Sequence, residues 1–227
     1  MTFAASDNRP PPAARCIPLF PTPMFSTMVD GHAALNSALL TEIRKHRGTQ
    51  RGVSKSNVHG WQSDNDMTRW GGAPAEQLAA TVVAMASRIT ADARNDPTRR
   101  VRWRPEMWAN ASGSGASNQT HWHPGSYLSA VYYVDDGYAG SASTELGGEL
   151  VFIDPRMPFL RMGDPELARR GADGSAPGTE AWLRPRSGLL VMFPSFLGHS
   201  VRPYLGNGLR VSIAINLVAA FEPVAAR

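Results

Sequence analysis

Apolar residues recur every three or four positions in two stretches of the first half of the chain, Gly31–Arg47 and Pro74–Arg94. The apolar stripe consists of Leu35, Leu39 and Ile43 in the first stretch and of Leu78, Val82, Met85 and Ile89 in the second. This period is typical of an amphipathic helix that buries one face. We therefore predict two helices that cover one face of a sheet.

From about Val101 onward the pattern changes to short segments rich in β-branched and aromatic residues, separated by Gly, Pro and Asp clusters. The segments that we predict as strands are Val101–Ala109, Tyr127–Val134, Glu149–Ile153, Ala181–Arg184, Gly188–Phe193, His199–Pro203 and Arg210–Leu217. Many short strands with turn residues between them predict a sandwich or barrel. The polar stretch Asp154–Thr179 is predicted to be a long loop, and loops of that length on a barrel are often functional.

The length of 227 residues fits a single domain with a sizeable core. We expect residues 1–16 to be a disordered, Pro-rich tail, 17–218 to form the domain, and 219–227 to be a C-terminal tail. No apolar run approaches the ~20 residues that a membrane span needs, and the start lacks the apolar stretch of a signal peptide. We expect no membrane partner.

The single cysteine, Cys16, excludes an intrachain disulfide and a zinc site of several cysteines, and it favours the reducing cytoplasm. The net charge is +4, and the densest stretch of basic residues is most simply interpreted as a solvated edge of the protein. No zinc-finger or other nucleic-acid-binding signature accompanies the charge, so we expect no nucleic-acid partner. We expect the protein to be a monomer or a homodimer.

Three histidines in the strand-rich half have the spacing of a metal site. His121 and His123 are two residues apart, and residues two apart on a strand point to the same side. A third imidazole, from His199 on a distant strand, would complete one face of a coordination sphere and leave positions open for substrates. Imidazole suits iron, zinc, copper or nickel, so these residues alone do not select the metal.

Arg210 and Ser212 share one face of a strand whose other face carries Val211, Ile213 and Ile215. An arginine in an otherwise apolar strand is costly to bury without an anionic partner. A guanidinium beside a hydroxyl is well suited to bind a carboxylate through two hydrogen bonds.

From Asn118 to Asn216 the chain resembles the prolyl-hydroxylase-like branch of the 2-oxoglutarate/Fe(II) dioxygenases. The motifs that carry the resemblance, in order, are His121-Trp122-His123, Leu128–Val134, Gly147–Phe152, Pro185–Gly188, His199-Ser200-Val201 and Arg210-Val211-Ser212. Further motifs, Leu19–Pro23, Ser56–Trp61 and Phe193-Pro194-Ser195, narrow the likeness to a bacterial group of such oxygenases known mostly by sequence, over roughly residues 17–218. The resemblance implies a mainly β fold, a double-stranded β-helix (jelly-roll, cupin-like) barrel with the N-terminal helices packed on one sheet.

The resemblance also implies a role for each matching residue. His121 and His199 match the histidines that bind Fe(II), and Arg210 matches the residue that pairs with the distal carboxylate of 2-oxoglutarate. Ser212 matches its hydroxyl helper, Tyr133 a tyrosine that reaches the same carboxylate, and Asn118 is a candidate additional polar contact. The implied cofactors are Fe(II), the co-substrate 2-oxoglutarate, and O2.

One departure from the family pattern leaves two interpretations open. The usual first motif is His-x-Asp, and here His123 stands at the aspartate position. In the first interpretation, His123 is the third ligand and three imidazoles hold the metal. In the second, the register slips by two residues, His123 is the first histidine, and Gly125 stands at the carboxylate position, as in the halogenases of the superfamily.

The resemblance predicts an oxygenase that couples 2-oxoglutarate decarboxylation to oxidation of a small molecule, polar or zwitterionic and amino-acid-like, with hydroxylation as the default outcome. Desaturation, cyclisation and halogenation use the same chemistry. A cupin-type enzyme with three histidines and no need of Arg210, or a catalytically silent ligand-binding barrel, are the alternatives. We expect the substrate to enter between the Asp154–Thr179 loop and the segment around Ser56–Asp66, with Asp154, Arg156 and Arg161 as candidate contacts.

Overall fold

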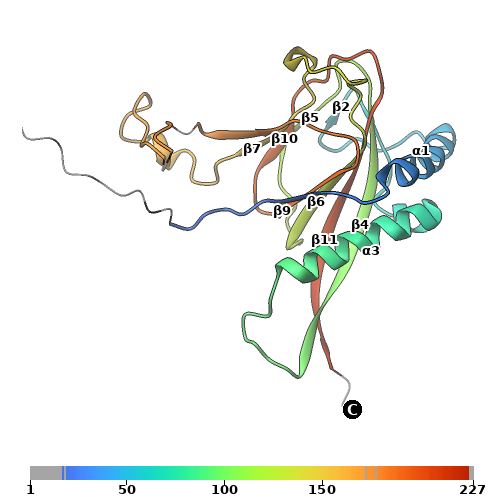
Figure 1. Ribbon diagram of the computed structural model, residues 1–227, viewed down its shortest axis with the longest axis horizontal. Coiled ribbons are helices and arrows are strands. Elements are labelled where there is room, and N and C mark those ends of the chain that lie inside the picture. The colour runs from blue at the N-terminus through green and yellow to red at the C-terminus, as the bar shows by residue number, and fades with distance from the viewer. Residues whose placement is uncertain (1–16, 18, 172, 177, 225–227) are drawn as a thin grey trace, which may run out of the picture.

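The computed structural model describes residues 17, 19–171, 173–176 and 178–224 (Figure 1). The predicted tail of residues 1–16 lies outside this range. Within this range the chain forms the α-helices α1 (His32–Thr49), α2 (Met67–Trp70) and α3 (Gly72–Ile89). The strands are β1 (Phe25–Met28), β2 (Asn57–Val58), β3 (Trp61–Gln62), β4 (Arg99–Ser112), β5 (Ser117–His121), β6 (Leu128–Asp135), β7 (Leu150–Ile153), β8 (Glu180–Leu183), β9 (Leu189–Pro194), β10 (His199–Val201) and β11 (Arg210–Pro223).

The strands form two antiparallel sheets that face each other. The major sheet has the order β1-β9-β6-β11-β4-β3, and the minor sheet has the order β2-β5-β10-β7-β8. Apart from the pairs β3-β4 and β7-β8, neighbouring strands are not consecutive in the chain, as expected when a chain winds back and forth between two sheets. The predicted double-stranded β-helix with flanking helices is confirmed.

Both predicted helices pack on the outer face of the major sheet (Figure 1). The stripe residues Leu39 and Ile43 of α1 and Leu78 and Val82 of α3 are buried in one cluster with the outward side chains of the sheet. The second helix ends five residues earlier than predicted, at Ile89, where Thr90 takes an extended backbone conformation. The helical layer therefore carries the larger hydrophobic core.

Strand β11 shows how one strand serves both the core and the barrel interior. Its odd-numbered residues from Val211 to Leu217 are buried in the cluster under the helices. Its even-numbered residues from Arg210 to Asn216 line a cavity between the two sheets. Successive side chains of a strand point to opposite faces, so alternation along β11 separates the packing residues from the polar ones.

The sequence patterns missed four strands, β1, β2, β3 and β5. These strands have two to five residues, too short for an alternating pattern to emerge. Residues 219–223, predicted to belong to a tail, instead continue β11 and pair with Arg99–Trp103 of β4. The domain therefore extends at least to Pro223.

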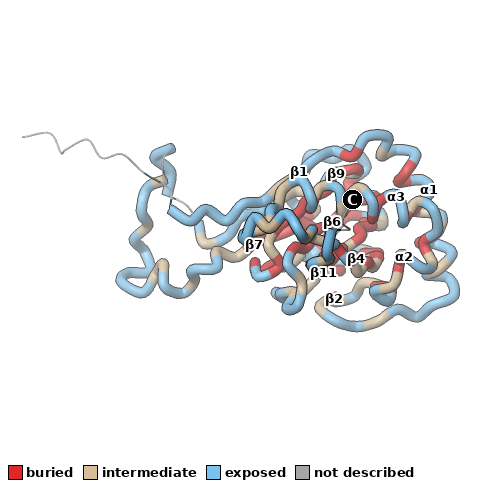
Figure 2. The backbone as a smooth tube through the Cα atoms, turned by 90° about the horizontal axis from the view of Figure 1, so that it is seen from below, coloured by how far each residue is buried: buried red, intermediate tan, exposed pale blue. Residues whose placement is uncertain are grey.

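The predicted loop between β7 and β8 forms an arm that projects from the barrel (Figure 1). A short 3₁₀ helix, Phe159–Arg161, is the regular element within it. Figure 2 shows that the arm is largely exposed while the buried residues gather in the barrel and under the helices. Among the described residues, no helix is both long enough and apolar enough to cross a membrane.

Candidate metal and co-substrate site

Three imidazoles meet beside the neighbouring strands β5 and β10 of the minor sheet. His121 is the last residue of β5 and lies directly opposite His199 of β10 in the strand pairing. The ring centroids of these two are 4.4 Å apart, and His123 lies 4.9 Å from His121 and 5.1 Å from His199. One nitrogen from each ring lies within 4.8 Å of the others, a spacing at which a single ion can contact all three.

The route by which His123 reaches the cluster differs from the one predicted. Strand β5 ends at His121, so the two histidines do not share a strand face. The backbone N–H of His123 instead donates to the carbonyl of Ser195, 3.3 Å away, and Pro124 follows at the turn. A loop anchored to the end of β9 therefore brings the third imidazole in.

Backbone carbonyls orient two of the rings. Nδ1 of His121 lies 2.7 Å from the carbonyl oxygen of Gln119, and Nδ1 of His199 lies 2.9 Å from that of Leu197. A proton on Nδ1 donated to each carbonyl leaves Nε2 unprotonated, with its lone pair available to a metal.

Burial keeps these imidazoles neutral. The pKa of His123 is lowered to about 3, first by burial and then by the neighbouring His199 and His121. Burial likewise lowers the pKa of His199 to about 4, and it lowers the pKa of His121. Metals bind the neutral imidazole, so protons compete weakly with a metal for this site at neutral pH.

A buried cation lies deeper in the same cavity. Arg210 is 2% exposed, and its Nε has no hydrogen-bond partner within the described part of the chain. None of the ion pairs among the described residues includes it. An unpaired buried charge is costly, so this guanidinium favours an anionic ligand.

Tyr133 stands beside that guanidinium. The guanidinium carbon of Arg210 lies 5.2 Å from the centre of the Tyr133 ring. The ring is fully buried, its hydroxyl lacks a partner among the described residues, and burial raises its pKa to about 12. The hydroxyl is therefore protonated and able to donate a hydrogen bond to a carboxylate beside Arg210.

Two glycines make room for Arg210. Gly148 has φ +79°, and a Cβ there would come within 3.3 Å of the Arg210 side chain. Gly137 has φ +76°, and a Cβ there would come within 2.6 Å of the hydroxyl of Tyr204. Both conformations favour glycine, and the Gly147-Gly148 pair noted in the sequence thus borders the anion site.

These groups line one cavity of about 540 Å³ between the two sheets. The seven residues predicted to bind the metal or the co-substrate all contribute to its wall: Asn118, His121, His123, Tyr133, His199, Arg210 and Ser212. Asn118 lies within β5, and its Nδ2 donates to Oγ of Ser56 over 3.1 Å. The cavity has the size of a typical small-molecule site.

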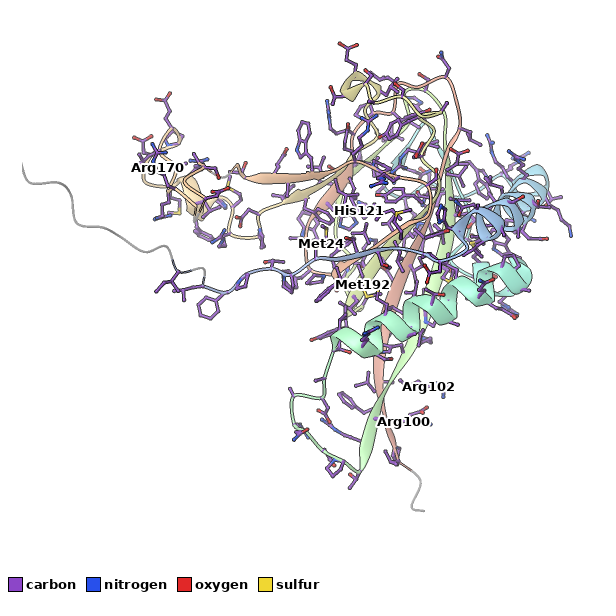
Figure 3. All side chains as sticks on the ribbon, viewed as in Figure 1. Met24, Arg100, Arg102, His121, Arg170 and Met192 are labelled. Carbon is purple, nitrogen blue, oxygen red and sulfur yellow. The ribbon has the colours of Figure 1, made fainter. Side chains whose placement is uncertain are left out.

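Of the two segments that we expected at the substrate entrance, one lines the cavity. Ser56 and the segment Gln62–Asn65 line the cavity, but no described residue of the Asp154–Thr179 loop does. Asp154 and Arg156 instead bind each other, with 2.6 Å between Oδ2 and Nη2. Figure 3 shows Arg170 at the end of the arm, well away from His121 in the barrel.

Among the polar residues of the cavity wall that the sequence patterns missed are Asn110 and Glu106. Asn110 lies opposite Ser212 in the strand pairing, and its buried Oδ1 has no partner among the described residues. The signal was present, because Glu106, Trp108 and Asn110 alternate with the buried Met107 and Ala109 along β4.

Comparison with known proteins identifies the relatives of this barrel. Residues 106–216 match the profile of a family described as "Putative 2OG-Fe(II) oxygenase". No protein with a curated description matches the chain.

Solved structures share the fold at low sequence identity. A prolyl hydroxylase from Trichoplax adhaerens, in complex with a hypoxia inducible factor peptide, has 15% identity and a TM-score of 0.59, with 86% of this chain and 83% of that chain covered. A prolyl-4-hydroxylase from Pseudomonas putida has 18% identity and a TM-score of 0.56, with 87% and 92% covered. HygX from Streptomyces hygroscopicus, with nickel, 2-oxoglutarate and hygromycin B bound, has 14% identity and a TM-score of 0.53, with 89% and 84% covered.

Proposed function

The chain belongs to the 2-oxoglutarate/Fe(II) oxygenases, and from that premise we propose that it couples decarboxylation of 2-oxoglutarate to the oxidation, by default hydroxylation, of a small polar or zwitterionic molecule. The observation that carries the proposal is that three neutral imidazoles line the same cavity as a buried guanidinium that has no ion pair within the described part of the chain. A keto acid with a second carboxylate can meet both at once.

The side chains present fit both absent groups. His121, His123 and His199 would hold Fe(II), because three neutral nitrogen donors lie within reach of one ion. Arg210 Nε and the hydroxyl of Tyr133, neither with a hydrogen-bond partner among the described residues, would hold the distal carboxylate of 2-oxoglutarate. Bound Fe(II) would supply the redox chemistry that couples O2 activation to the conversion of 2-oxoglutarate into succinate and carbon dioxide.

The protein's own contribution is placement and exclusion of water. Arg210 neutralises the distal carboxylate, and Ser212, opposite Tyr133 in the strand pairing, adds a hydroxyl at the same level. Asn118 supplies a further polar contact on the minor sheet, near the histidines. The buried apolar side chains of Leu150 and Phe193 also line the cavity and help to exclude water from it.

Of the two interpretations of the histidine motif, the proposal takes the one with three histidine ligands. His121 lies in the histidine cluster, but the shifted register would give this residue no role. Gly125, which that register places at the metal, is not among the described residues that line the cavity. Three neutral ligands leave the full charge of a divalent ion in the site, and this shifts its redox behaviour relative to a site with a carboxylate.

Replacement of Arg210 tests the proposal. We expect Arg210→Ala to raise the KM for 2-oxoglutarate by at least about 100-fold, because a buried carboxylate would lose its partner. Substrate-independent succinate release measures this, and calorimetric titration of 2-oxoglutarate into Zn(II)-loaded protein checks it without turnover. The control is Arg102→Ala, since Arg102 is exposed and pairs with Glu222 on the surface.

An unchanged KM and unchanged binding in Arg210→Ala would refute the proposal. Metal binding that persists in that case would point to a cupin-type enzyme, which uses the same three histidines without the guanidinium.

A further inference from the structure

We propose that the cavity selects an amine: Glu106, which lies opposite Asn216 and next to Trp108, binds a protonated nitrogen of the substrate. This inference rests on the proposed function, because it names the substrate class of the same cavity. It goes beyond the expectation of a polar or zwitterionic molecule by assigning the charge that is recognised and the residues that recognise it.

The three residues share the interior face of the major sheet. Glu106 and Trp108 are two residues apart on β4, and both line the cavity. Asn216 of β11 lies directly opposite Glu106, and Ser129 of β6 lies directly opposite Asn216. Directly opposite residues have Cβ atoms about 5 Å apart, so Glu106, Asn216 and Ser129 form one polar row across three strands.

This polar row lies at the level of the histidines and away from the co-substrate. Trp108 has its ring centre 5.7 Å from that of His123. Ser129 pairs with Phe193, whose ring centre is 4.9 Å from that of His199. Along β11, Asn216 is six residues beyond Arg210, about 20 Å of strand. A ligand on the polar row thus leaves Arg210 free for 2-oxoglutarate.

Hydrogen bonds within the polar row settle which atoms face a ligand. The hydroxyl of Ser129 donates to Oδ1 of Asn216 over 2.9 Å, which occupies the amide's acceptor. The Asn216 amide, 9% exposed, is left with its N–H groups, which cannot accept from an ammonium group but can donate to the Glu106 carboxylate opposite and orient it. Beside them, Glu106 contributes an acceptor with a full negative charge.

The recorded ion pair of Glu106 is too weak to occupy its carboxylate. Nη2 of Arg104 lies 3.5 Å from Oε1 of Glu106, and the Arg104 side chain is 71% exposed. Exposed pairs of this kind contribute less than about 1 kcal/mol, and Arg104 is not among the described residues that line the cavity. The carboxylate therefore remains available to a ligand inside the barrel.

A carboxylate beside an indole ring favours an ammonium group. The charge-assisted hydrogen bond to Glu106 and the cation–π contact with Trp108 both require positive charge on the ligand. Two other charged residues line the mouth of the cavity, Asp64 and Lys55, and both are exposed. Asp64 adds to the negative potential, while Lys55 can meet an anionic group on the same molecule, so amino-acid-like amines fit.

A matched pair of small probes tests the inference. Benzylamine and benzyl alcohol are nearly equal in shape, but only the first is protonated at neutral pH. Each is titrated into ¹⁵N-labelled protein loaded with Zn(II) and 2-oxoglutarate, and the indole N–H signal of Trp108, assigned with Trp108→Phe, reports binding. We expect benzylamine to bind about tenfold more tightly, a difference of about 1.4 kcal/mol.

In Glu106→Gln, which keeps the size of the side chain, the two dissociation constants should come within about twofold of each other. The control is Glu145→Gln, in an exposed turn, which should keep the tenfold preference. Equal binding of the two probes by the wild type, no saturable binding of benzylamine at millimolar concentration, or a preference that survives in a folded Glu106→Gln protein would each overturn the inference.

The same samples separate this inference from the proposed function. Binding of 2-oxoglutarate is measured first, before either probe is added. Failure of 2-oxoglutarate to bind, with the amine preference intact in the Zn(II) protein, would refute the oxygenase proposal and leave the amine site standing. Normal 2-oxoglutarate binding without an amine preference would refute the amine site and leave the oxygenase proposal standing.

Discussion

The two faces of the major sheet are built from the same strands and serve different purposes. On the outer face, Ile213 and Ile215 of β11 are fully buried under the helices. On the inner face of the same strand, Arg210, Ser212 and Asn216 are nearly as buried, but their polar groups face a cavity. Burial alone therefore does not distinguish the packed core from the site.

The difference lies in which buried polar groups lack partners and where they lie. The outer face is mainly apolar side chains in mutual contact, and its polar atoms without a partner among the described residues are isolated ring nitrogens such as Nε1 of Trp103. On the inner face, Nε of Arg210, the hydroxyl of Tyr133 and Oδ1 of Asn110 have no hydrogen-bond partner in the described part of the protein. Buried polar groups are normally hydrogen-bonded, so three such atoms along one cavity wall indicate a place kept for a ligand.

The largest expected effect comes from removing a metal ligand on the inner side. His199→Ala should lower both metal content and succinate release by at least about 100-fold, because two imidazoles hold a divalent ion far less tightly than three. Metal analysis after dialysis and an assay of 2-oxoglutarate turnover measure this. His59→Ala, at an exposed histidine away from the cavity, serves as the control, and full metal occupancy in His199→Ala would contradict the assignment.

Next in size is a change on the outer face. Ile213→Ala removes a fully buried side chain and should lower the free energy of unfolding by about 2–5 kcal/mol. The KM for 2-oxoglutarate should stay unchanged in the folded fraction, since Ile213 faces the helices. Urea unfolding and the succinate assay measure the two quantities. A changed KM at unchanged stability would show that the two faces are not separate in function.

The matching change on the inner face should behave in the opposite way. Ser212→Ala removes one hydroxyl beside Arg210 and should raise the KM for 2-oxoglutarate by roughly tenfold, with a stability change below about 1 kcal/mol. The same two measurements apply. Ser129→Ala is the control, because its hydroxyl bonds Asn216 at the other end of the cavity. Equal KM values for Ser212→Ala and the control would argue against a hydroxyl at the carboxylate.

The smallest effect is a dependence of stability on pH in metal-free protein. An unfolded histidine has a pKa near 6.5, while burial lowers the folded pKa of His199 to about 4. The contribution of His199 to the free energy of unfolding is therefore full above its unfolded pKa. It is lost as the pH falls toward the folded pKa, because the unfolded state then binds a proton that the folded state does not. When the pH is lowered from about 7.5 to 5.5, protonation of His199 in the unfolded state should lower the free energy of unfolding by about 1 kcal/mol.

Urea unfolding of the metal-free protein at those two pH values measures this loss, with His199→Gln as the comparison. The variant should lose about 1 kcal/mol less than the wild type. Equal losses in the two proteins would show that His199 is protonated in the folded state as readily as in water.

Much of the barrel was predictable because strand periodicity marks both faces. The alternation from Arg210 to Leu217 predicted a strand with one polar and one apolar face, and the structure places it in the centre of the major sheet. The amphipathic helices were predictable for the same reason, with an error at Ile89 because helix ends depend on local capping.

Other features depend on long-range contacts that periodicity does not encode. His123 leaves β5 and is held by the carbonyl of Ser195, more than seventy residues away in sequence, so its position could not follow from strand alternation. The arm at Asp154–Thr179 was predicted to be a loop, but its direction away from the cavity is set by the pairing of β7 with β8. Glu106 was not predicted as a site residue because it follows Pro105 in a segment that is rich in arginine.

The most direct test is a crystal structure from oxygen-free crystals grown with Fe(II) and 2-oxoglutarate, with the metal located by anomalous scattering at the iron edge. We expect one iron bound by His121, His123 and His199, and the distal carboxylate of 2-oxoglutarate within hydrogen-bonding distance of Arg210 and the hydroxyl of Tyr133. An iron that His123 does not contact, or a 2-oxoglutarate whose carboxylate lies away from Arg210, would contradict this arrangement.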